Sequence, residues 1–168
     1  MPAKALLIMG AALVAAGLGL SRAAPVLQAA GPGEPKLTGT RGFRNNNPGN
    51  IRAAGDVWVG QVGIDAGGYV IFDTPEHGLR ALARIMLNYQ RLHGIDTLNA
   101  LVARYAPASD SNDESSYVQD LSARLGIGPS APFSIEAMLV PLMQAIIRHE
   151  NGSQPYALAQ IQAGVDLA

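Results

Sequence analysis

Glu150 is the side chain in this sequence whose type and position best suit acid–base chemistry. Leu139, Met143 and Ile146 form an apolar stripe with helical spacing. Glu150 continues this stripe four residues later, in the last turn before the helix-stop signal Asn151-Gly152. Burial and the negative end of the helix dipole both favour the protonated carboxyl. A carboxylic acid that keeps its proton can donate it to the oxygen of a breaking glycosidic bond.

The other glutamates have structural explanations, and they are Glu34, Glu76, Glu114 and Glu136. Glu34 lies in a predicted linker. Glu76 and Glu136 lie in the first turn of predicted helices, where the helix dipole favours a negative charge. Glu114 follows Ser111 by three residues, which is the spacing of a capping box. For Glu150 the structural alternative is an ion pair at the domain edge with Arg148 or Arg80.

The composition narrows the chemistry further. The sequence has no cysteine, which excludes disulfides, thiol catalysis and cysteine-bound zinc. The three histidines fall on separate predicted segments without a ligand spacing, so we expect no metal and no other cofactor; they are His77, His93 and His149. The net charge of -1 argues against a nucleic-acid partner, which would need a basic surface.

Residues 41–52, with the sequence RGFRNNNPGNIR, form the most unusual stretch, because four asparagines and a Pro-Gly pair cannot form a core. One interpretation is a tight turn held by Asx hydrogen bonds. The other is a sugar-binding surface, since Asn amides offer donors and acceptors to hydroxyl and acetamido groups, and aromatic rings can stack on a sugar. The predicted substrate-binding residues are therefore Asn45, Asn46, Asn47, Asn50, Trp58, Tyr69 and Tyr156. For Trp58, half-buried packing in a hairpin is the structural alternative.

Periodicity and capping signals predict the elements that position these residues. β-Forming residues between positions 50 and 72, interrupted by glycines, predict a small antiparallel hairpin. Start and stop signals predict helices from Thr74 to Gly94, from Thr97 to Ala106, from Ser111 to Gly126, from Ser134 to Gly152 and from Pro155 to Leu167. The predicted fold class is mainly α with a small antiparallel β-hairpin, which is the organisation of lysozyme-like domains.

The N-terminal residues 1–22 are predicted to form a signal or membrane-anchor helix. Lys4 precedes sixteen uncharged residues, and small residues follow at Ser21 and Ala23, as at a signal cleavage site. Sixteen helical residues span roughly 24 Å at ~1.5 Å each, less than the hydrocarbon core of about 30 Å. A cleaved signal, a retained anchor and a weak anchor that later slips out all remain open. Residues 23–41, rich in Pro and Gly, are predicted to be a flexible linker before a domain at 42–168.

Four stretches of the domain resemble a family of phage and prophage virion-associated murein lysins, some known only as structural or lytic proteins. These stretches are RGFRNNNPGNIR (41–52), the Trp58-x-Gly60 step, FDTPEHGLRALARIMLNYQ (72–90) and IIRHENGSQPY (146–156). The resemblance covers nearly all of 42–168. It implies a lysozyme-like fold and attack on peptidoglycan, at the glycan strand or, in some relatives, at the peptide.

A looser resemblance to flagellar-type glucosaminidases concerns the order of the motifs. NNPGNIR, W-x-G and F-x-x-P-x-x-G resemble the part of those enzymes that follows their catalytic glutamate, whose helix comes first. Here no suitable glutamate precedes Arg41, and IIRHENG looks like the missing helix placed at the C-terminus, as in a circularly permuted lysozyme-like domain. The murein lysins tend to carry Pro-Ser-Glu-Asn after the helix that ends near Ala106. This chain departs from them there and offers only Asp110 in place of that glutamate.

The predicted function is cleavage of the peptidoglycan glycan strand with Glu150 as the acid. A lytic transglycosylase, which the sequence slightly favours, needs one glutamate. A muramidase or glucosaminidase needs a second carboxylate, for which Asp65, Asp73 and Asp110 are unranked candidates. The alternatives are a non-catalytic, membrane-anchored virion or murein-binding protein, and a murein peptidase, which the lack of a metal motif and of cysteine disfavours.

The predicted partners and location follow from the same reading. We expect the protein to bind peptidoglycan glycan strands, to attach to a membrane through its N-terminal helix and to contact other virion proteins. The expected location is the virion membrane, or the host inner membrane and periplasm.

Overall fold

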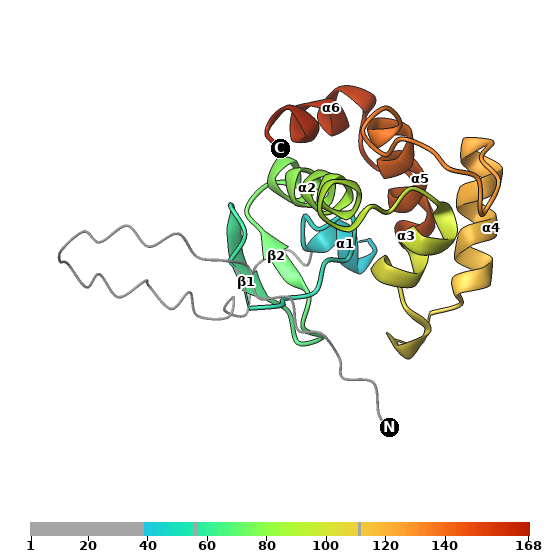
Figure 1. The fold of residues 1–168 in the computed structure, drawn as a ribbon. Coiled ribbons are helices and arrows are strands. Elements are labelled where there is room, and N and C mark those ends of the chain that lie inside the picture. Colours follow the sequence, from blue (N-terminus) through green and yellow to red (C-terminus); the bar gives the residue numbers. More distant parts are fainter. Residues whose placement is uncertain (1–38, 56, 111) are drawn as a thin grey trace, which may run out of the picture.

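The computed structural model describes residues 39–55, 57–110 and 112–168 (Figure 1). The predicted signal or anchor helix at 1–22 and nearly all of the predicted linker at 23–41 lie outside the described residues. Within the described ranges, every helix is too short or too polar to cross a bilayer. The folded part includes the last linker residues, because Thr40 caps the first helix by accepting a hydrogen bond from the Phe43 N–H at 3.4 Å.

The described chain is mainly helical with one two-stranded antiparallel sheet, which confirms the coarse fold class predicted from the sequence. The elements in chain order are α1 (Arg41–Arg44), β1 (Gln61–Ile64), β2 (Val70–Phe72), α2 (Pro75–His93), α3 (Leu98–Tyr105), the 3₁₀ helix η1 (Ala108–Asp110), α4 (Glu114–Leu125), α5 (Leu139–Asn151) and α6 (Leu158–Asp166).

The hairpin lies inside the predicted 50–72 segment. β1 pairs with β2 in an antiparallel register that places Ile64 opposite Val70. The chain reverses at Asp65, whose Oδ1 accepts hydrogen bonds from the backbone N–H groups of Gly67 at 2.8 Å and Tyr69 at 3.0 Å. This Asx-type turn explains why the reversal falls on an aspartate followed by small residues.

Helix α2 is the central element and follows its predicted signals. Thr74 caps it by accepting from the His77 N–H at 3.3 Å, and Gly94 ends it in the left-handed conformation. Figure 1 shows the hairpin to the lower left of α2, α1 below it, and helices α3 and α4 to its right. Its Leu82 and Met86 side chains are completely buried, so α2 forms the middle of the core.

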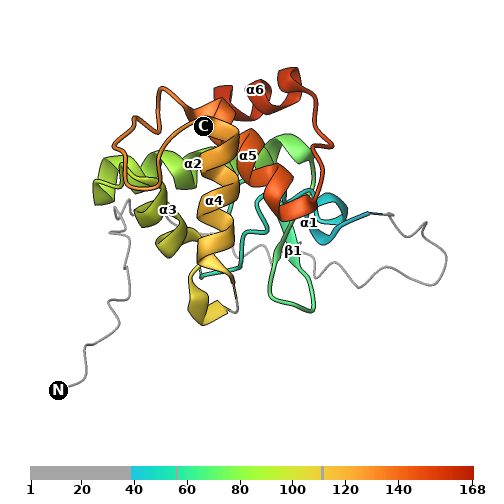
Figure 2. The ribbon, with the colours of Figure 1, turned by 90° about the vertical axis from the view of Figure 1, so that its right-hand side faces the viewer.

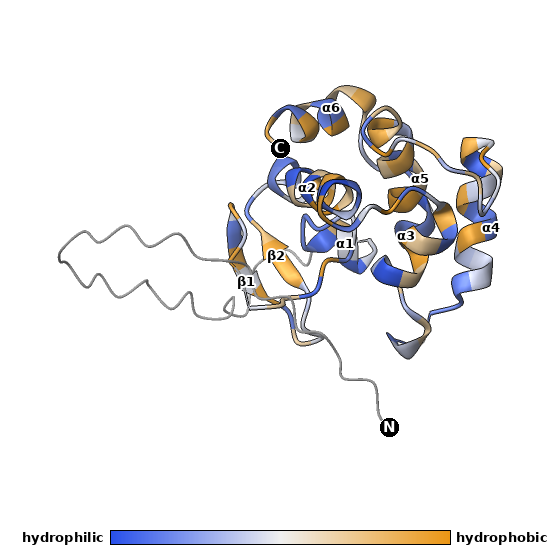
Figure 3. Cartoon of the chain, in the orientation of Figure 1, coloured by the Kyte–Doolittle hydropathy of each residue, from blue (hydrophilic) through white to orange (hydrophobic). Residues whose placement is uncertain are grey.

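The C-terminal helix α6 packs directly on α2, as Figures 1 and 2 show. The two helices can approach this closely because Gly164 has no side chain. A Cβ there would lie 2.4 Å from the Cβ of Leu79. The chain end is fixed as well, since Arg84 donates a hydrogen bond to the Ala168 carbonyl at 2.9 Å. In Figure 3, strand β2 and helix α5 are among the most hydrophobic elements, in keeping with their place in the core.

Two predicted helix starts are wrong. Helix α5 begins at Leu139 rather than at Ser134, whose hydroxyl instead closes a separate turn by accepting from the Ala137 N–H at 3.1 Å. A helix that started at Ser134 would place Pro141 in its interior, where proline removes a backbone hydrogen bond and clashes with the preceding turn. Starting at Leu139 puts the proline in the first turn, where its missing N–H costs nothing.

Helix α4 begins later than predicted, at Glu114 rather than at Ser111. Its N-cap is Asp113, whose carboxylate accepts from the Ser116 N–H at 3.0 Å. Glu114 instead accepts from the Ala108 N–H at 2.7 Å, which ties η1 to the start of α4. Ser111 lies outside the described residues. The prediction considered Ser111 alone, although aspartate is as good an N-cap residue as serine.

Candidate active site

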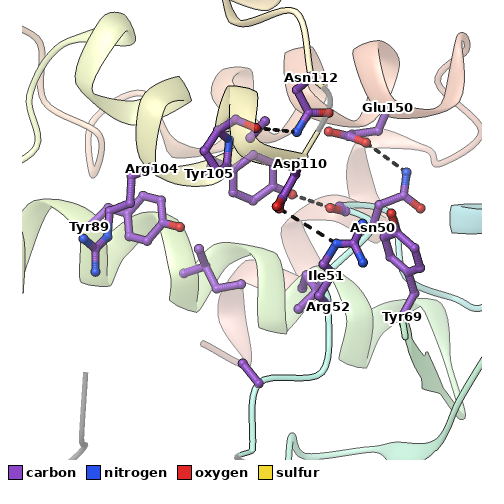
Figure 4. A pocket seen from close by; sticks show the side chains of 15 residues that line it. Asn50, Ile51, Arg52, Tyr69, Tyr89, Arg104, Tyr105, Asp110, Asn112 and Glu150 are labelled. Carbon is purple, nitrogen blue, oxygen red and sulfur yellow. Dashed lines mark hydrogen bonds and ion pairs between the residues drawn. The ribbon is translucent and has the colours of Figure 1, made fainter. Parts of the chain in front are cut away.

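A cleft of about 390 Å³ opens between the Asn-rich turn, the α3–η1 segment and the C-terminal end of α5 (Figure 4). Tyr69 of the hairpin and two residues of α2 complete its lining, so segments far apart in the sequence meet at one place. The lining residues are Gly49, Asn50, Ile51, Arg52, Ala54, Tyr69, Ile85, Tyr89, Arg104, Tyr105, Ala106, Pro107, Asp110, Asn112 and Glu150.

Glu150 lines this cleft from the last turn of α5 and is held by two neutral donors. Asn50 donates from Nδ2 to Oε2 at 2.9 Å, and Tyr117 donates from its hydroxyl to Oε1 at 2.9 Å. Among the described residues Glu150 has no ion-pair partner within 4.0 Å. The alternative of a pair with Arg80 is wrong, since Arg80 donates to the Leu167 carbonyl. A half-buried carboxyl without a cation is chemically available to a ligand.

Asn151 fixes the end of α5 against the Asn-rich turn. Its Nδ2 donates to the Pro48 carbonyl at 3.0 Å and to the Ile147 carbonyl at 2.9 Å. Its Oδ1 accepts from the Thr40 hydroxyl at 2.6 Å. Gly42 is required at this contact, because a Cβ there would lie 2.5 Å from Asn151 Oδ1. The buried amide therefore sets the distance between the turn and the Glu150 helix.

Asn50 reaches Glu150 because its backbone is in the left-handed region, with φ of 47°. Asparagine tolerates this conformation better than other residues with a Cβ. The hydroxyl of Tyr105 donates to the carbonyl of Gly49, the residue just before Asn50. Gly49 has no room for a side chain, since a Cβ would lie 2.5 Å from that hydroxyl oxygen. The turn is thus anchored on both sides of the asparagine that contacts Glu150.

Two tyrosines support the carboxyl from the buried side. Burial raises the pKa of Tyr105 and of Tyr117 well above the usual range, and the nearby Glu150 charge adds to both shifts. Both hydroxyls therefore stay protonated and act as donors. The Tyr117 ring stacks on His149 with centroids 3.7 Å apart and an interplanar angle of 17°.

The imidazole of His149 is held in turn from α4. Its Nδ1 lies 2.9 Å from Asp120 Oδ2, and Arg124 donates to the other carboxylate oxygen at 2.8 Å. The hydrogen bond from Arg124, followed by that of His149, lowers the pKa of Asp120 despite the opposing effect of burial. This α4–α5 network fixes the aromatic ring that carries the donor to Glu150.

Of the three candidates for a second carboxylate, Asp110 is the one that lines the same cleft as Glu150. It lies in η1 and pairs with Arg52 at 4.0 Å (Figure 4). Asp65 and Asp73 do not line the cleft. Asp65 holds the hairpin turn, and Asp73 contacts His77 Nδ1 at 2.6 Å and the Thr74 N–H.

Three of the four predicted asparagine ligands point into the protein rather than into the cleft. Asn45 donates to Asp65 Oδ2 at 2.8 Å, and Asn46 donates to the carbonyls of Phe72 and Asp73. Asn47 is completely buried and makes three hydrogen bonds to the backbone. Their positions do not fit the predicted contact with substrate, and they support the Asx-turn interpretation. Only Asn50 of the four lines the cleft.

The predicted aromatic ligands divide in the same way. Tyr69 lines the cleft, with the guanidinium groups of Arg41 and Arg52 at 4.1 Å and 4.6 Å from its ring centroid. Trp58 is half-buried against the core and lies outside the cleft lining, as its structural alternative required. Tyr156 is buried and also lies outside, and burial raises its pKa to about 12. The prediction that Trp58 and Tyr156 face substrate does not match these positions.

Several residues that line the cleft or hold Glu150 in it had no recognisable signal in the sequence. Tyr117 occupies an apolar helical position that is typical of a core residue, and Tyr105 lies near a helix end without a partner in view. Arg104 and Arg52 looked like ordinary surface charges. In the described part of the chain, no group of three His, Asp or Glu side chains is placed to hold a metal ion.

Two comparisons with known proteins bear on this chain. No protein-family model matches the chain. It is 35% identical over 130 residues to Protein P5 of Pseudoalteromonas phage PM2, a match that covers 75% of this chain and 80% of that protein. Identity at this level over most of both chains shows common descent, and the chain therefore belongs to the family of this phage Protein P5.

Proposed function

We propose that this protein cleaves the glycan strand of peptidoglycan, with Glu150 as the proton donor. The observation that carries the proposal is the setting of Glu150, whose carboxyl lines a cleft, accepts hydrogen bonds from Asn50 and Tyr117, and has no cationic partner among the described residues. An arginine in contact with the carboxyl would compete with a ligand for it, whereas the two neutral donors hold the carboxyl in place and leave it without a cation.

In the proposed reaction, Glu150 transfers its proton to the glycosidic oxygen while the bond between that oxygen and the anomeric carbon breaks. Positive charge develops on the ring in an oxocarbenium-like state. The oxygen leaves as a hydroxyl of the departing sugar, and the Glu150 carboxylate remains. The carboxylate is then positioned to accept a proton from the nucleophile that attacks the anomeric carbon.

The nucleophile distinguishes the two forms of this chemistry. In a lytic transglycosylase the C6 hydroxyl of the same sugar attacks, forms a 1,6-anhydro ring and returns its proton to Glu150, so one carboxyl is enough. In a hydrolase water attacks, and a second carboxylate assists it. Asp110 is the residue that we assign to this second role, because it is the other carboxylate that lines the cleft among the described residues.

The lysozyme-like relation and the circular permutation belong to this proposal. A glutamate at the end of a helix, beside a small hairpin and a polar turn, is the arrangement expected of such a domain. The permutation requires that the C-terminal Glu150 lie next to the Asn-rich turn, and the hydrogen bond from Asn50 across 100 residues supports it. We also propose that the protein works in a phage virion and is attached to a membrane through residues 1–22.

The test is a product analysis with the full-length protein and purified peptidoglycan. We expect Glu150→Gln to abolish the release of soluble fragments and Glu136→Gln to leave it unchanged. Glu136 is a suitable matched control, since its side chain is 65% exposed and pairs with Arg91 on another face. Mass spectrometry then assigns anhydro-muramyl ends to a transglycosylase and reducing ends to a hydrolase. Free stem peptides, or binding to murein without any product, would contradict the proposal.

A further inference from the structure

We infer that the end of the cleft opposite Glu150 binds a carboxylate of the murein polymer through Arg104. The inference rests on the proposed function for the identity of the polymer. It goes further in naming the charged group that the cleft recognises and the residue that recognises it.

Arg104 lies in the last turn of α3 and lines the same cleft as Glu150. Figure 4 shows Arg104 beside Tyr89 at one end of the row of labelled side chains, while Glu150, Asn50 and Tyr69 lie at the other. The cleft therefore carries a carboxyl at one end and a guanidinium at the other.

The charges that line the cleft do not all cancel within the protein. Asp110 and Arg52 pair with each other at 4.0 Å. Glu150 is satisfied by neutral donors only. Arg104 has no carboxylate within 4.0 Å among the described residues. One carboxyl and one guanidinium thus remain without an opposite charge, and they stand at different ends of the cleft.

The protein contacts of Arg104 leave most of its hydrogen-bonding capacity unused. One terminal nitrogen lies 3.0 Å from His93 Nε2, and the guanidinium carbon lies 5.2 Å from the Tyr89 ring centroid. Its Nε is buried and has no acceptor. A guanidinium carries five N–H donors in a planar fork that matches a carboxylate. The buried Nε is closed to a ligand, so an anion at the cleft end would accept from the terminal N–H groups of the guanidinium.

Murein differs from other N-acetylated glycans in its carboxylates. Every second sugar carries a lactyl group, which is either a free carboxylate or amide-linked to a stem peptide that bears carboxylates of its own. Chitin has the same acetamido groups and no carboxylate. A cleft with an acid at one end and an unpaired guanidinium at the other is therefore suited to murein and not to chitin.

The experiment measures binding, so that it does not depend on cleavage. Full-length protein carrying Glu150→Gln is titrated with soluble peptide-bearing glycan strands, with strands stripped of peptides, and with chitohexaose. Each titration is repeated with Arg104→Gln and Arg104→Lys added. Arg148→Gln is the matched control, because Arg148 is an exposed arginine that lines a different cavity. Unfolding curves of all variants confirm that they are folded.

We expect Arg104→Gln to weaken binding of at least one anionic strand by about tenfold or more, since charge-assisted hydrogen bonds are the strong ones. Arg104→Lys should restore part of the loss, and chitohexaose should bind all variants alike. A loss confined to peptide-bearing strands identifies a stem-peptide carboxylate, and a loss confined to stripped strands identifies the lactyl group. Equal weakening of chitohexaose, or no weakening of any strand, overturns the inference.

The two proposals fail separately. Cleavage by the unaltered protein without any effect of Arg104→Gln removes the carboxylate site and leaves the glycosidase. Arg104-dependent binding without any cleaved product removes the glycosidase and leaves the carboxylate site. If the protein binds none of the three ligands, the carboxylate site is refuted as well.

Discussion

Substitution of Asn47 tests whether the Asn-rich turn is a structural device or a ligand surface. The side chain is completely buried and makes three hydrogen bonds to the backbone. Its Nδ2 donates to the carbonyls of Ile51 and Val70, each at 2.9 Å, and its Oδ1 accepts from the Ile51 N–H at 2.8 Å. The amide thus joins the turn to strand β2.

The expected cost of Asn47→Ala follows from these three contacts. The Ile51 N–H would be left buried without an acceptor, which costs about 1–3 kcal/mol. The two carbonyls each lose a donor, worth about 1 kcal/mol apiece, although the Ile51 carbonyl keeps its bond from the Val70 N–H. We therefore expect the free energy of unfolding to fall by about 3–5 kcal/mol, a large part of the total for a domain of this size.

Urea unfolding followed by circular dichroism measures this loss. Asn47→Asp is a sharp companion variant, because its carboxylate can accept from the Ile51 N–H but cannot donate to either carbonyl, and we expect it to be at least as destabilising. Asn50→Gly is the contrast, since its left-handed φ suits glycine and its amide reaches only the half-buried Glu150; we expect about 1 kcal/mol. A cost below about 1 kcal/mol for Asn47→Ala would refute the structural role that we assign to this amide.

Three further predictions concern the surroundings of the site. Tyr117→Phe removes one donor from Glu150, a hydrogen bond worth about 1.5–3 kcal/mol, so initial rates of murein solubilisation should fall by about 10–100-fold, and an unchanged rate would contradict its positioning role. Folding lowers the pKa of Asp120 below its usual 3.8. The ionised carboxylate therefore stabilises the folded state fully above about pH 4, and this stabilisation is lost as the pH falls through the lowered pKa. The free energy of unfolding, measured from pH 6 to 2, should depend less on acid in Asp120→Asn than in the unaltered protein. Gly164→Ala would place a Cβ 2.4 Å from that of Leu79 and should lower the urea midpoint by an amount equivalent to about 1–3 kcal/mol, whereas an unchanged midpoint would mean that α6 moves freely on α2.

The sequence predicted elements well wherever a cap and a stop signal stand at both ends. Thr74 and Gly94 bound α2 as expected, because each satisfies backbone groups that only a few residue types can satisfy. The start of α5 was misplaced, since the effect of Pro141 depends on its register within the helix. A proline seven residues after Ser134 was evidence against a helix start at that serine.

The site was predictable only where a residue conflicted with its own helix. Glu150 stood out because an apolar stripe and a helix C-terminus both disfavour a carboxylate. Tyr117 and Tyr105 gave no such conflict, since a tyrosine on a buried helix face is an ordinary core residue until its hydroxyl partner is known. The asparagines were instead predicted to bind a ligand, although most of them have a structural role. Their amides suit a ligand and a turn equally well, and only the fold reveals that three of them bond to the hairpin.

The contacts around Glu150 also make the site dependent on both ends of the folded domain. Thr40 binds Asn151 across 111 residues, and Asn50 binds Glu150 across 100 residues. Neither hydrogen bond can form until α5 has docked on the turn, so the carboxyl acquires its two donors only in the complete fold. A domain boundary at residue 42 would omit Thr40, remove the cap of α1 and leave Asn151 Oδ1 without its donor beside the proposed acid. The last residues of the predicted linker therefore belong to the support of the site, and any change that pulls Thr40 away from α5 should act on Glu150 through Asn151.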